Sequence, residues 1–370
     1  MRIAINAADL DHSRIDGTRI YIQNLLKNFG LLNKEDQFLI YHRSQFNPEL
    51  TFPIFENYQI RSLRFPFWWT QTRFAWEIFC KKPDVLWMPM HSLPCLRSRK
   101  TKTVVTIHDL AFKFFPEHFP KKDLHRLNFF TDHAVRHADK IISVSNSTKN
   151  DLLKVYPTLR KEKIKVIYHG YDKELYNSKI DKGRIMEVRN KYKIPYAKYF
   201  IYLGAIQPRK NVGLLIDAFE IFKKDARYEN VGLVIAGELG WLYGNVVKKI
   251  ENAEQAMATG KFHPQDSPAL LAGSVALVLP SLYEGFGLPA LEAMACGTPV
   301  VAADNSSLAE ITGEYGLLFK DNDASDLAEK LKRILDDEKL RENLGQKGLE
   351  RAKHFSWEKC ARETLDWLKF

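Results

Sequence analysis

The stretch SLYEGFGLPALEAMACGTPVVA, residues 281–302, places two glutamates, Glu284 and Glu292, around a turn that contains two glycines and a proline. The apolar run VALVLP at 275–280 predicts a buried strand before the turn, and TPVVAA at 298–303 predicts another after it. The letters ALEAMA between them predict a short helix. A strand, a glycine-rich turn, a helix and a second strand form the repeating unit of a parallel α/β sheet.

This turn has the features of a ligand-binding segment. Pro289 suits the first turn of the helix, and Gly285 and Gly287 allow a ligand to approach the backbone closely. Backbone N–H groups at a helix start bind anions or hydroxyls, and carboxylates accept hydrogen bonds from sugar hydroxyls. The two glutamates therefore predict a binding site for a nucleotide-sugar, with one glutamate at each end of the ligand. The alternative is an ordinary helix start, where the helix dipole favours a glutamate without any ligand.

The alternation of strand and helix patterns extends through both halves of the chain. Strands are predicted at 2–7, 37–42, 85–90, 102–110, 140–146, 163–170, 199–204, 231–237, 275–280 and 298–303, and helices at 18–32, 130–138, 146–157 and 212–224. The polar stretch 172–198 has no strand pattern and predicts the linker. We therefore expect an α/β protein of two Rossmann-like, doubly wound domains, which bind ligands at the carboxyl ends of their strands.

The domain boundaries follow from this pattern. We expect an N-terminal domain at 1–178, a C-terminal domain at 179–352, and an amphipathic C-terminal helix at 353–370. A chain of 370 residues is long enough for two such cores.

Composition narrows the class of protein. The net charge of +10 fits nucleic acid, an anionic membrane surface, a phosphorylated substrate or an ordinary solvated surface. No apolar run approaches the ~20 residues that span a bilayer, and the N-terminus lacks the apolar core of a signal peptide. The four cysteines have no metal or redox spacing, so we expect reduced thiols and a cytoplasmic location.

Other candidate site residues also follow predicted strands. Arg209 and Lys210 follow the strand at 199–204, where they can neutralise a diphosphate, although such a pair is also common on a solvated surface. His108 ends the strand at 102–110 and has a catalytic or a structural role. Gly17 lies between a strand and a helix, where a phosphate can approach.

The longest motif carries a specific resemblance. The residues PSLYEGFGLPALEAMACGTPVVAADNSSLAEITGEYGLLF at 280–319, with LGAIQPRKN, TIHDL and VIYHGYD, resemble the family 4 retaining glycosyltransferases in the same order over nearly the whole chain. The resemblance implies the GT-B fold, whose C-terminal helix crosses back to the first domain. It implies transfer of a hexose from a nucleotide-sugar to an acceptor hydroxyl, with retention and without a metal or other cofactor.

The resemblance also implies residue roles. Glu292 would hold the ribose hydroxyls and Lys210 the diphosphate, and Glu284 and His108 would contact the transferred sugar as the catalytic residues. Arg209 would replace an arginine that many relatives carry where this chain has Ala205. The remaining donor-binding positions are Gly17, Gly285, Phe286, Gly287 and Leu288; the segment 260–274 resembles the nucleotide-base loop, and Glu310 matches a recurrent glutamate without an assigned role.

The N-terminal half resembles mannosyltransferases of bacterial surface polysaccharides, which implies GDP-mannose as donor and a glycan or lipid-linked glycan as acceptor. A UDP-hexose such as UDP-glucose is the alternative donor. The segment RFPFWWTQTRFAW at 64–76 fits a membrane interface, stacking on acceptor sugars, or a helix packed on the sheet edge. The alternatives from other classes are a nucleic-acid-binding protein, which the charge suggests, and a non-catalytic sugar-binding protein. No recognised nucleic-acid motif appears, so we expect no nucleic acid as a partner. A non-catalytic relative would have lost Glu284, Lys210 or His108, and this chain keeps all three.

Overall fold

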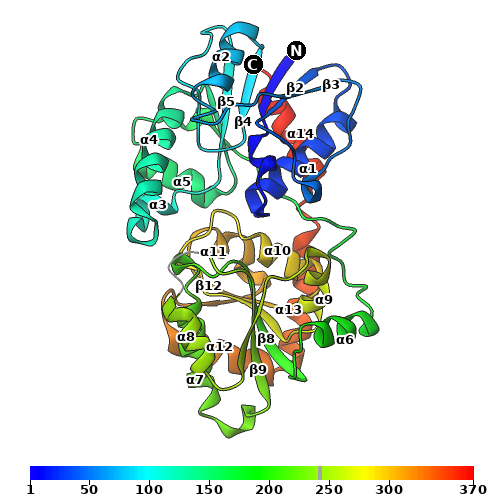
Figure 1. Cartoon of the computed structure of the whole chain (residues 1–370). Coiled ribbons are helices and arrows are strands. Elements are labelled where there is room, and N and C mark those ends of the chain that lie inside the picture. The colour runs from blue at the N-terminus through cyan, green and yellow to red at the C-terminus, as the bar shows by residue number, and fades with distance from the viewer. Residues whose placement is uncertain (241–243) are drawn as a thin grey trace. The chain divides into compact units, whose positions relative to one another are not determined.

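A computed structural model describes residues 1–240 and 244–370. The chain forms two compact units (Figure 1), each with its own parallel sheet covered by helices. Unit 1 comprises Met1–Gly170 and Ser356–Phe370, and unit 2 comprises Tyr171–Phe355. The chain therefore leaves unit 1 at Gly170, where the sequence predicted 178, and returns at Ser356, where it predicted 353.

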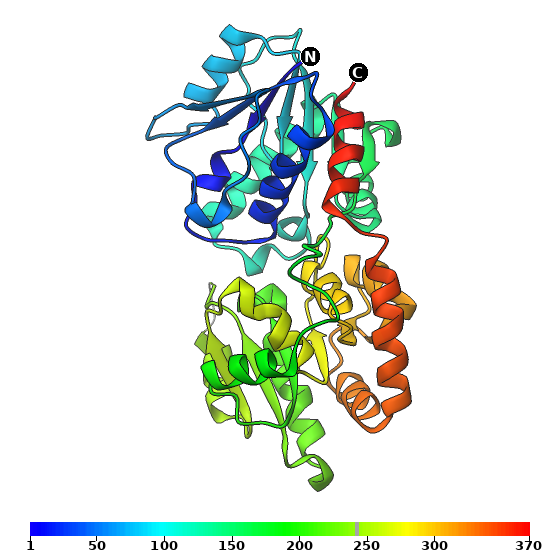
Figure 2. The same cartoon turned by 90° about the vertical axis from the view of Figure 1, so that its right-hand side faces the viewer.

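Unit 1 has a seven-stranded parallel sheet in the order β3-β2-β1-β4-β5-β6-β7. Its strands are β1 (Arg2–Asn6), β2 (Gln37–His42), β3 (Tyr58–Ser62), β4 (Val85–Met88), β5 (Lys102–Ile107), β6 (Lys140–Ser143) and β7 (Ile164–Val166). Its helices are α1 (Gly17–Leu32), α2 (Arg73–Lys81), α3 (Ala111–Phe114), α4 (Lys121–His137), α5 (Asn146–Val155) and α14 (Trp357–Leu368). Figure 2 shows α14, in red, beside α1, in blue, and the two helices are in contact.

Unit 2 has a six-stranded parallel sheet in the order β10-β9-β8-β11-β12-β13. Its strands are β8 (Lys198–Leu203), β9 (Val231–Ala236), β10 (Ala256–Gly260), β11 (Ala276–Leu279), β12 (Val300–Ala303) and β13 (Leu317–Phe319). Its helices are α6 (Lys182–Lys191), α7 (Val212–Lys223), α8 (Gly244–Asn252), α9 (Ser267–Ala272), α10 (Leu288–Ala295), α11 (Ser306–Thr312), α12 (Ala324–Asp336) and α13 (Glu338–Ala352).

The predicted α/β class is confirmed, and each predicted strand overlaps a strand of the structure. One helix was missed, and the start of another was predicted wrongly. The stretch 172–198, which was predicted to hold the linker, also contains α6, a largely polar helix that begins at the Asp181 cap. Helix α4 begins at Lys121 and not at 130; its first turns are largely polar, and their Leu124 and Leu127 are only partly buried against the core. The strands β3, β10 and β13 were not predicted.

Local chemistry explains where the helices next to the site begin. The Asp16 carboxylate accepts the Arg19 backbone N–H and caps α1. The inward side of α1 then buries Tyr21, Leu25 and Phe29 against the sheet. Within residues 1–240 and 244–370, no helix combines the length and apolar character that crossing a membrane requires.

Candidate active site

In unit 2, two loops meet at the carboxyl edge of the sheet. Strands β8 and β11 pair in parallel, so the segments that follow them emerge side by side. The first loop forms a short 3-10 helix, η5 (Pro208–Lys210), and the second is 280–287. The Leu282 backbone N–H donates to the Arg209 carbonyl at 2.9 Å, and the Arg209 guanidinium donates to the Tyr283 carbonyl at 3.0 Å. These bonds fix Arg209 against the second loop.

The buried carboxylate of Glu284 is the centre of this contact. Its Oε1 accepts hydrogen bonds from Lys210 Nζ at 2.5 Å and from Ser281 Oγ at 2.7 Å. Its Oε2 lies 3.6 Å from Arg209 Nη1. Burial alone would raise the pKa of Glu284, but the two cations outweigh burial and hold this pKa below its ordinary value. Glu284 is therefore an anion at neutral pH, held between two cations.

The start of α10 has the conformation that the glycine-rich turn predicts. Gly287 has φ +95°, in the left-handed region, and a Cβ there would lie 3.1 Å from the Leu308 side chain. Pro289 lies in the first turn of α10. Gly285 and Phe286 are buried in the turn, and Leu288 is the half-buried first residue of the helix. The backbone N–H groups of this turn thus lie at the carboxyl edge of the sheet.

Glu292 lies one turn further along α10 and is half-buried. Burial raises its pKa to about 7; a hydrogen bond with the Tyr176 phenol lowers it, and the Asp172 carboxylate adds to the rise. Both neighbours belong to the segment after Gly170, in which the sequence predicted no contact with Glu292. Glu292 is consequently poised to gain or lose a proton near neutral pH.

The segment 260–274 is anchored to α6 through Asp266. The Asp266 side chain is buried and accepts hydrogen bonds from Arg184 at 2.5 Å, Lys191 at 2.6 Å and the Tyr192 phenol at 2.7 Å. These three partners hold the pKa of Asp266 below its ordinary value against the opposing effect of burial. This anchor was not predicted, because α6 and Asp266 lie more than 70 positions apart.

In unit 1, His108 directly follows β5 and lies in a group of aromatic rings. Its backbone N–H donates to His91 Nε2 at 2.9 Å, and its own Nε2 lies 2.8 Å from the Pro89 carbonyl. Because a carbonyl can only accept, Nε2 of His108 carries a proton and Nδ1 is the acceptor. Burial, with the neighbouring His91, lowers the pKa of His108 to about 4, so this ring is neutral at pH 7.

The rings around His108 were not predicted. Tyr21 has its ring centroid 5.1 Å from His108 and 4.8 Å from His169, and the His169 ring lies 5.5 Å from Trp357 of α14. Burial also lowers the pKa of His91 and His169. The only signal in the sequence was the motif VIYHGYD, which contains His169. Gly17, also in unit 1, is the first residue of α1 and follows the Asp16 cap.

The structure thus brings Arg209, Lys210 and Glu284 into direct contact and places the glycine turn and Glu292 on the adjoining helix. Gly17 and His108 belong to the other unit. Glu310 lies on α11, and its carbonyl accepts a hydrogen bond from Arg351 at 3.0 Å. Among residues 1–240 and 244–370, no group of three or more His, Cys, Asp or Glu side chains is arranged to hold a metal ion.

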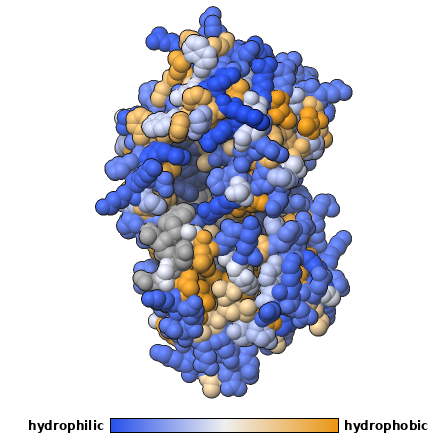
Figure 3. Space-filling view, viewed as in Figure 1, coloured by the Kyte–Doolittle hydropathy of each residue, from blue (hydrophilic) through white to orange (hydrophobic). Residues whose placement is uncertain are grey.

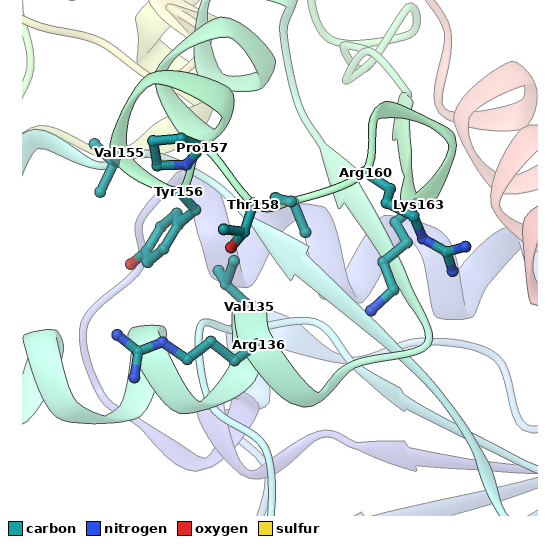
Figure 4. Close-up of a pocket in the computed structure, with 9 residues that line it drawn as sticks. Val135, Arg136, Val155, Tyr156, Pro157, Thr158, Arg160 and Lys163 are labelled. Carbon is teal, nitrogen blue, oxygen red and sulfur yellow. The ribbon is translucent and has the colours of Figure 1, made fainter.

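A cavity of about 390 Å³ lies elsewhere on unit 1 (Figure 4). Its walls come from the end of α4 and from the segment after α5, and they include Arg136, Tyr156, Arg160 and Lys163. Both segments lead into strands, so the cavity lies at the amino edge of the sheet. In Figure 4 Arg136 and Arg160 point to opposite sides and do not converge on one position. None of the predicted site residues lines this cavity.

Comparison with known proteins decides the family. The model described as Glycosyltransferase Family 4 matches residues 32–175, and the model described as Glycosyl transferases group 1 matches residues 185–351. The chain is 30% identical over 302 residues to O-antigen chain mannosyltransferase B of Escherichia coli, covering 80% of this chain and 77% of that protein. The chain belongs to glycosyltransferase family 4. It is therefore an enzyme, and the resemblance of its motifs is confirmed.

Two further relatives match this glycosyltransferase over less of their own length. An uncharacterized glycosyltransferase of Methanocaldococcus jannaschii is 35% identical over 234 residues, covering 63% of this chain and 60% of that protein. The serotype-specific mannosyltransferase WbdA of Escherichia coli is 26% identical over 271 residues, covering 72% of this chain and 33% of that protein.

Solved structures confirm the GT-B fold of the glycosyltransferase. The Anabaena protein HepE, determined in complex with UDP and glucose, matches with a TM-score of 0.75 and 18% identity over 100% of this chain and 99% of that one. WaaG, a glycosyltransferase involved in lipopolysaccharide biosynthesis, matches with a TM-score of 0.76 and 15% identity over 99% of both chains. At these identities the likeness shows the fold alone.

Proposed function

We propose that this enzyme transfers mannose from GDP-mannose to a hydroxyl of a glycan or lipid-linked glycan during the synthesis of a cell-surface polysaccharide. The observation that carries the proposal is the contact of Arg209 and Lys210 with Glu284 beside the glycine turn of α10. Two cations and a row of backbone N–H groups suit a diphosphate, and a carboxylate suits sugar hydroxyls. Relatives named as mannosyltransferases support mannose as the sugar.

The proposed reaction retains the configuration at the anomeric carbon. The bond from this carbon to the diphosphate oxygen breaks, and the diphosphate takes the electron pair. Arg209, Lys210 and the N–H groups at the start of α10 stabilise the charge that develops there. The acceptor hydroxyl attacks from the face that the diphosphate leaves, and a phosphate oxygen takes its proton. This route needs no enzyme nucleophile, and in our proposal no metal or other cofactor.

The remaining predicted residues take roles in the same proposal. Glu292 holds the ribose hydroxyls, and Glu284 the hydroxyls of the transferred sugar. His108 contacts the donor sugar; its protonated Nε2 is bound to the Pro89 carbonyl, which leaves Nδ1 as an acceptor for a sugar hydroxyl. Gly17 leaves room for the diphosphate. We further propose a cytoplasmic location with peripheral contact to an anionic membrane, which places the enzyme where a lipid-linked acceptor is found.

A UDP-hexose is the second candidate donor. HepE, which shares the fold, was determined in complex with UDP-glucose. The proposed ribose and diphosphate contacts suit both donors, because GDP-mannose and UDP-glucose have these groups in common. The choice between them therefore depends on the segment 260–274 that is proposed to contact the base and on the contacts to the sugar, since mannose and glucose differ in configuration at C2.

The test is a donor panel. Hydrolysis or transfer is measured with GDP-, UDP- and ADP-sugars, with and without EDTA, for the wild type, Glu292→Ala and the control Glu329→Ala on the exposed side of α12. We expect one preferred donor, no effect of EDTA, activity reduced by roughly a hundredfold or more in Glu292→Ala, and an unchanged control. Turnover of a UDP-sugar alone would exclude GDP-mannose, and loss of activity in EDTA would exclude the metal-free route.

A further inference from the structure

Exposed aromatic side chains are concentrated in one short part of unit 1. Among the residues that the structure describes, the exposed Phe and Trp side chains all belong to unit 1. Five of them lie within 15 positions of one another: Phe65, Phe67, Trp68, Trp76 and Phe79. Trp68 is 72% exposed, Phe67 71% and Trp76 57%. A group of large exposed apolar side chains of this kind marks an interaction surface in most proteins.

Helix α2 presents part of this group on its outer side. Its inward side buries Phe74 and Ile78 in the core of unit 1. Trp76 and Phe79, three positions apart, point outward, and their rings stack at 6.1 Å. The helix is therefore apolar on both sides, and only the inward side has a partner in unit 1.

The loop before α2 holds its aromatic residues in a fixed arrangement. Trp69 is buried, and its Nε1 donates to the Leu63 carbonyl at 2.6 Å. The hydroxyl and the backbone N–H of Thr72 both donate to the Trp68 carbonyl, at 3.1 and 3.0 Å. Trp68 itself has φ +47°, a left-handed conformation that is unfavourable for a bulky residue. The hydrogen bonds from Trp69 to Leu63 and from Thr72 to Trp68 thus fix the loop with the Trp68 side chain outward.

Helix α4 extends the same surface and adds positive charge. The Trp68 and Phe130 rings lie 6.2 Å apart, which places the loop against α4. On α4, Phe129 is exposed and so are Lys122 and Arg126. In Figure 3 orange and pale residues alternate with blue ones over the region where Figure 1 places α2 and α4.

Other charges on this surface are mostly positive. Arg64, Lys81 and Lys82 are exposed at the two ends of the loop and helix. The acid of α2, Glu77, is buried and paired with Arg61 at 3.5 Å and Arg73 at 2.9 Å. Asp123 of α4 is exposed beside Lys121 and Lys122. The exposed charges are thus mainly cationic and surround the aromatic group.

The charge of the whole chain follows the same division. Unit 1 contains 30 Lys and Arg against 19 Asp and Glu, and unit 2 contains 25 against 26, which together give the net +10. The net positive charge therefore belongs to unit 1 alone. A substrate diphosphate held in unit 2 does not account for this excess.

We propose that the loop at 64–72, the outer side of α2 and the outer side of α4 form a docking surface for an anionic lipid bilayer. This inference extends the membrane contact of the proposed function by naming the surface. Trp and Phe insert at the level of the lipid headgroups, and the surrounding Lys and Arg bind the anionic headgroups. Because exposed Lys and Arg surround the aromatic side chains, a negatively charged bilayer is a better binding partner for this surface than a neutral apolar protein surface.

The position of this surface in the fold is consistent with a lipid-linked acceptor. The loop at 64–72 follows β3, so it lies at the carboxyl edge of the unit 1 sheet. His108 follows β5 at the same edge, because all seven strands are parallel. The loop end of this surface therefore lies at the edge that carries His108, whereas α2 runs on to the opposite edge, where it leads into β4.

The test is sedimentation with vesicles that contain no acceptor. The wild type is compared on vesicles of pure phosphatidylcholine and on vesicles with about one third phosphatidylglycerol. We expect binding only to the second kind, and weaker binding at high salt. The variant Trp68→Ser/Trp76→Ser should bind roughly tenfold more weakly, whereas the control Leu31→Ser/Met186→Ser, which alters exposed apolar residues elsewhere, should bind as the wild type does.

Charge and insertion are tested separately. Arg64→Glu/Arg126→Glu should also weaken binding by roughly tenfold, and Lys320→Glu/Lys347→Glu, an equal change of charge in unit 2, should have a much smaller effect. Lipids brominated on their acyl chains should quench the tryptophan fluorescence of the bound wild type. Trp68→Phe/Trp76→Phe should still bind but show less quenching.

Three results would overturn the inference. The first is equal binding of the wild type to both kinds of vesicle. The second is that the patch variants and the control variants weaken vesicle binding equally. The third is that the wild type is a dimer in sedimentation velocity, and that Trp68→Ser/Trp76→Ser is a monomer that still binds vesicles. The last result would assign the surface to contact between copies of the chain. Donor turnover without vesicles should be unchanged in these variants, so a failure of the proposed glycosyl transfer is seen separately from a failure of docking.

Discussion

At the scale of single residues, two glutamates eight positions apart have opposite pKa shifts. Two cations hold the pKa of Glu284 below its ordinary value even though the carboxylate is buried. The neighbours that act on Glu292 are the Tyr176 phenol and the Asp172 carboxylate, neither of which is a cation. Burial raises the pKa of Glu292 to about 7. The same loop and helix thus contain one glutamate that is ionised at neutral pH and one that titrates near neutral pH. Different surroundings give two chemically identical side chains different protonation states.

This difference predicts how nucleotide binding depends on pH. If ribose hydroxyls donate to the Glu292 carboxylate, binding must remove the proton that Glu292 carries below about pH 7. The affinity for a nucleoside diphosphate should then rise between about pH 6 and pH 8, by up to roughly tenfold per pH unit below the pKa. Calorimetric titration at several pH values, in buffers of different ionisation enthalpy, measures both the affinity and the proton release.

Glu292→Gln is the matched variant, because glutamine keeps the size of the side chain but cannot titrate. Its affinity should be low and nearly independent of pH over the same range. The Glu329→Gln control on α12 should retain the pH dependence of the wild type. A wild-type affinity that falls as the pH rises would contradict a carboxylate contact with the ribose.

The residues of the candidate donor site could be named from the sequence, but the contacts between them could not. The spacing of Glu284 and Glu292 and the position of Gly287 could be predicted because a strand, a turn and a helix are local patterns. The bond between Lys210 and Glu284 joins residues 74 positions apart and depends on the pairing of β8 with β11. No local pattern specifies which strands become neighbours.

At the scale of elements, α14 shows how a single helix completes a unit. It begins at the Ser356 cap, whose side chain accepts the Lys359 N–H. It buries Leu365 and Leu368 and packs against α1, near the opposite end of the sequence. A Cβ on Gly170 would lie 2.0 Å from the Trp357 backbone nitrogen, so only glycine fits at this point of unit 1. The core of unit 1 therefore requires the last helix of the chain.

The burial of α14 predicts the cost of shortening one of its side chains. Leu368 is fully buried, and Leu368→Ala should lower the free energy of unfolding by about 2–5 kcal/mol through lost transfer energy and a residual cavity. The exposed neighbour Lys369→Ala should change it by less than about 0.5 kcal/mol. Urea unfolding of the whole chain measures both values. A loss below about 1 kcal/mol for Leu368→Ala would show that α14 contributes little to unit 1.

Elements with a clear apolar pattern were predicted, and polar or edge elements were not. The helix at 18–32 was predicted from its apolar side and corresponds to α1. Helix α6 buries only Val188 fully, so its sequence resembles a linker. Strand β3 lies at the edge of its sheet and is largely half-buried or exposed, which leaves no continuous apolar run. Tyr21 lies within the helix predicted at 18–32, but its ring contact with His169 depends on tertiary packing.

At the scale of the whole molecule, the two units contain different sets of titrating groups. Unit 1 contains the buried His91, His108 and His169, whose pKa values are all lowered by burial. Unit 2 contains Glu292, whose pKa is raised. Unfolding restores each group to its ordinary pKa. The two units should therefore respond in opposite directions to mild acid.

The sign follows from which state binds more protons. Between pH 6.5 and about 4 the unfolded state protonates histidines that the folded unit 1 keeps neutral, so the stability of unit 1 should fall as the pH falls. The pKa of His108 is lowered from 6.5 to about 4, and a shift of one pKa unit corresponds to ~1.36 kcal/mol. Protonation of His108 alone can therefore lower the free energy of unfolding of unit 1 by about 3 kcal/mol over this pH range. Between pH 7 and 4.5 the folded unit 2 binds the extra proton at Glu292, so its stability should rise as the pH falls.

Hydrogen exchange followed by mass spectrometry separates the two units within the intact chain. As the pH is lowered from 7 to 5, after correction for intrinsic exchange, β4 and β5 should lose protection, whereas β8 and β11 should keep or gain it. In His108→Gln the loss in unit 1 should be smaller, because glutamine does not titrate, while the core around Tyr21 keeps a polar group of similar size. Because the pKa of Glu284 is lowered, protonation of Glu284 should reduce the stability of unit 2 only as the pH falls below about 4.5. Loss of protection in β8 and β11 before β4 and β5 would therefore contradict the assignment of the acid-sensitive groups to unit 1.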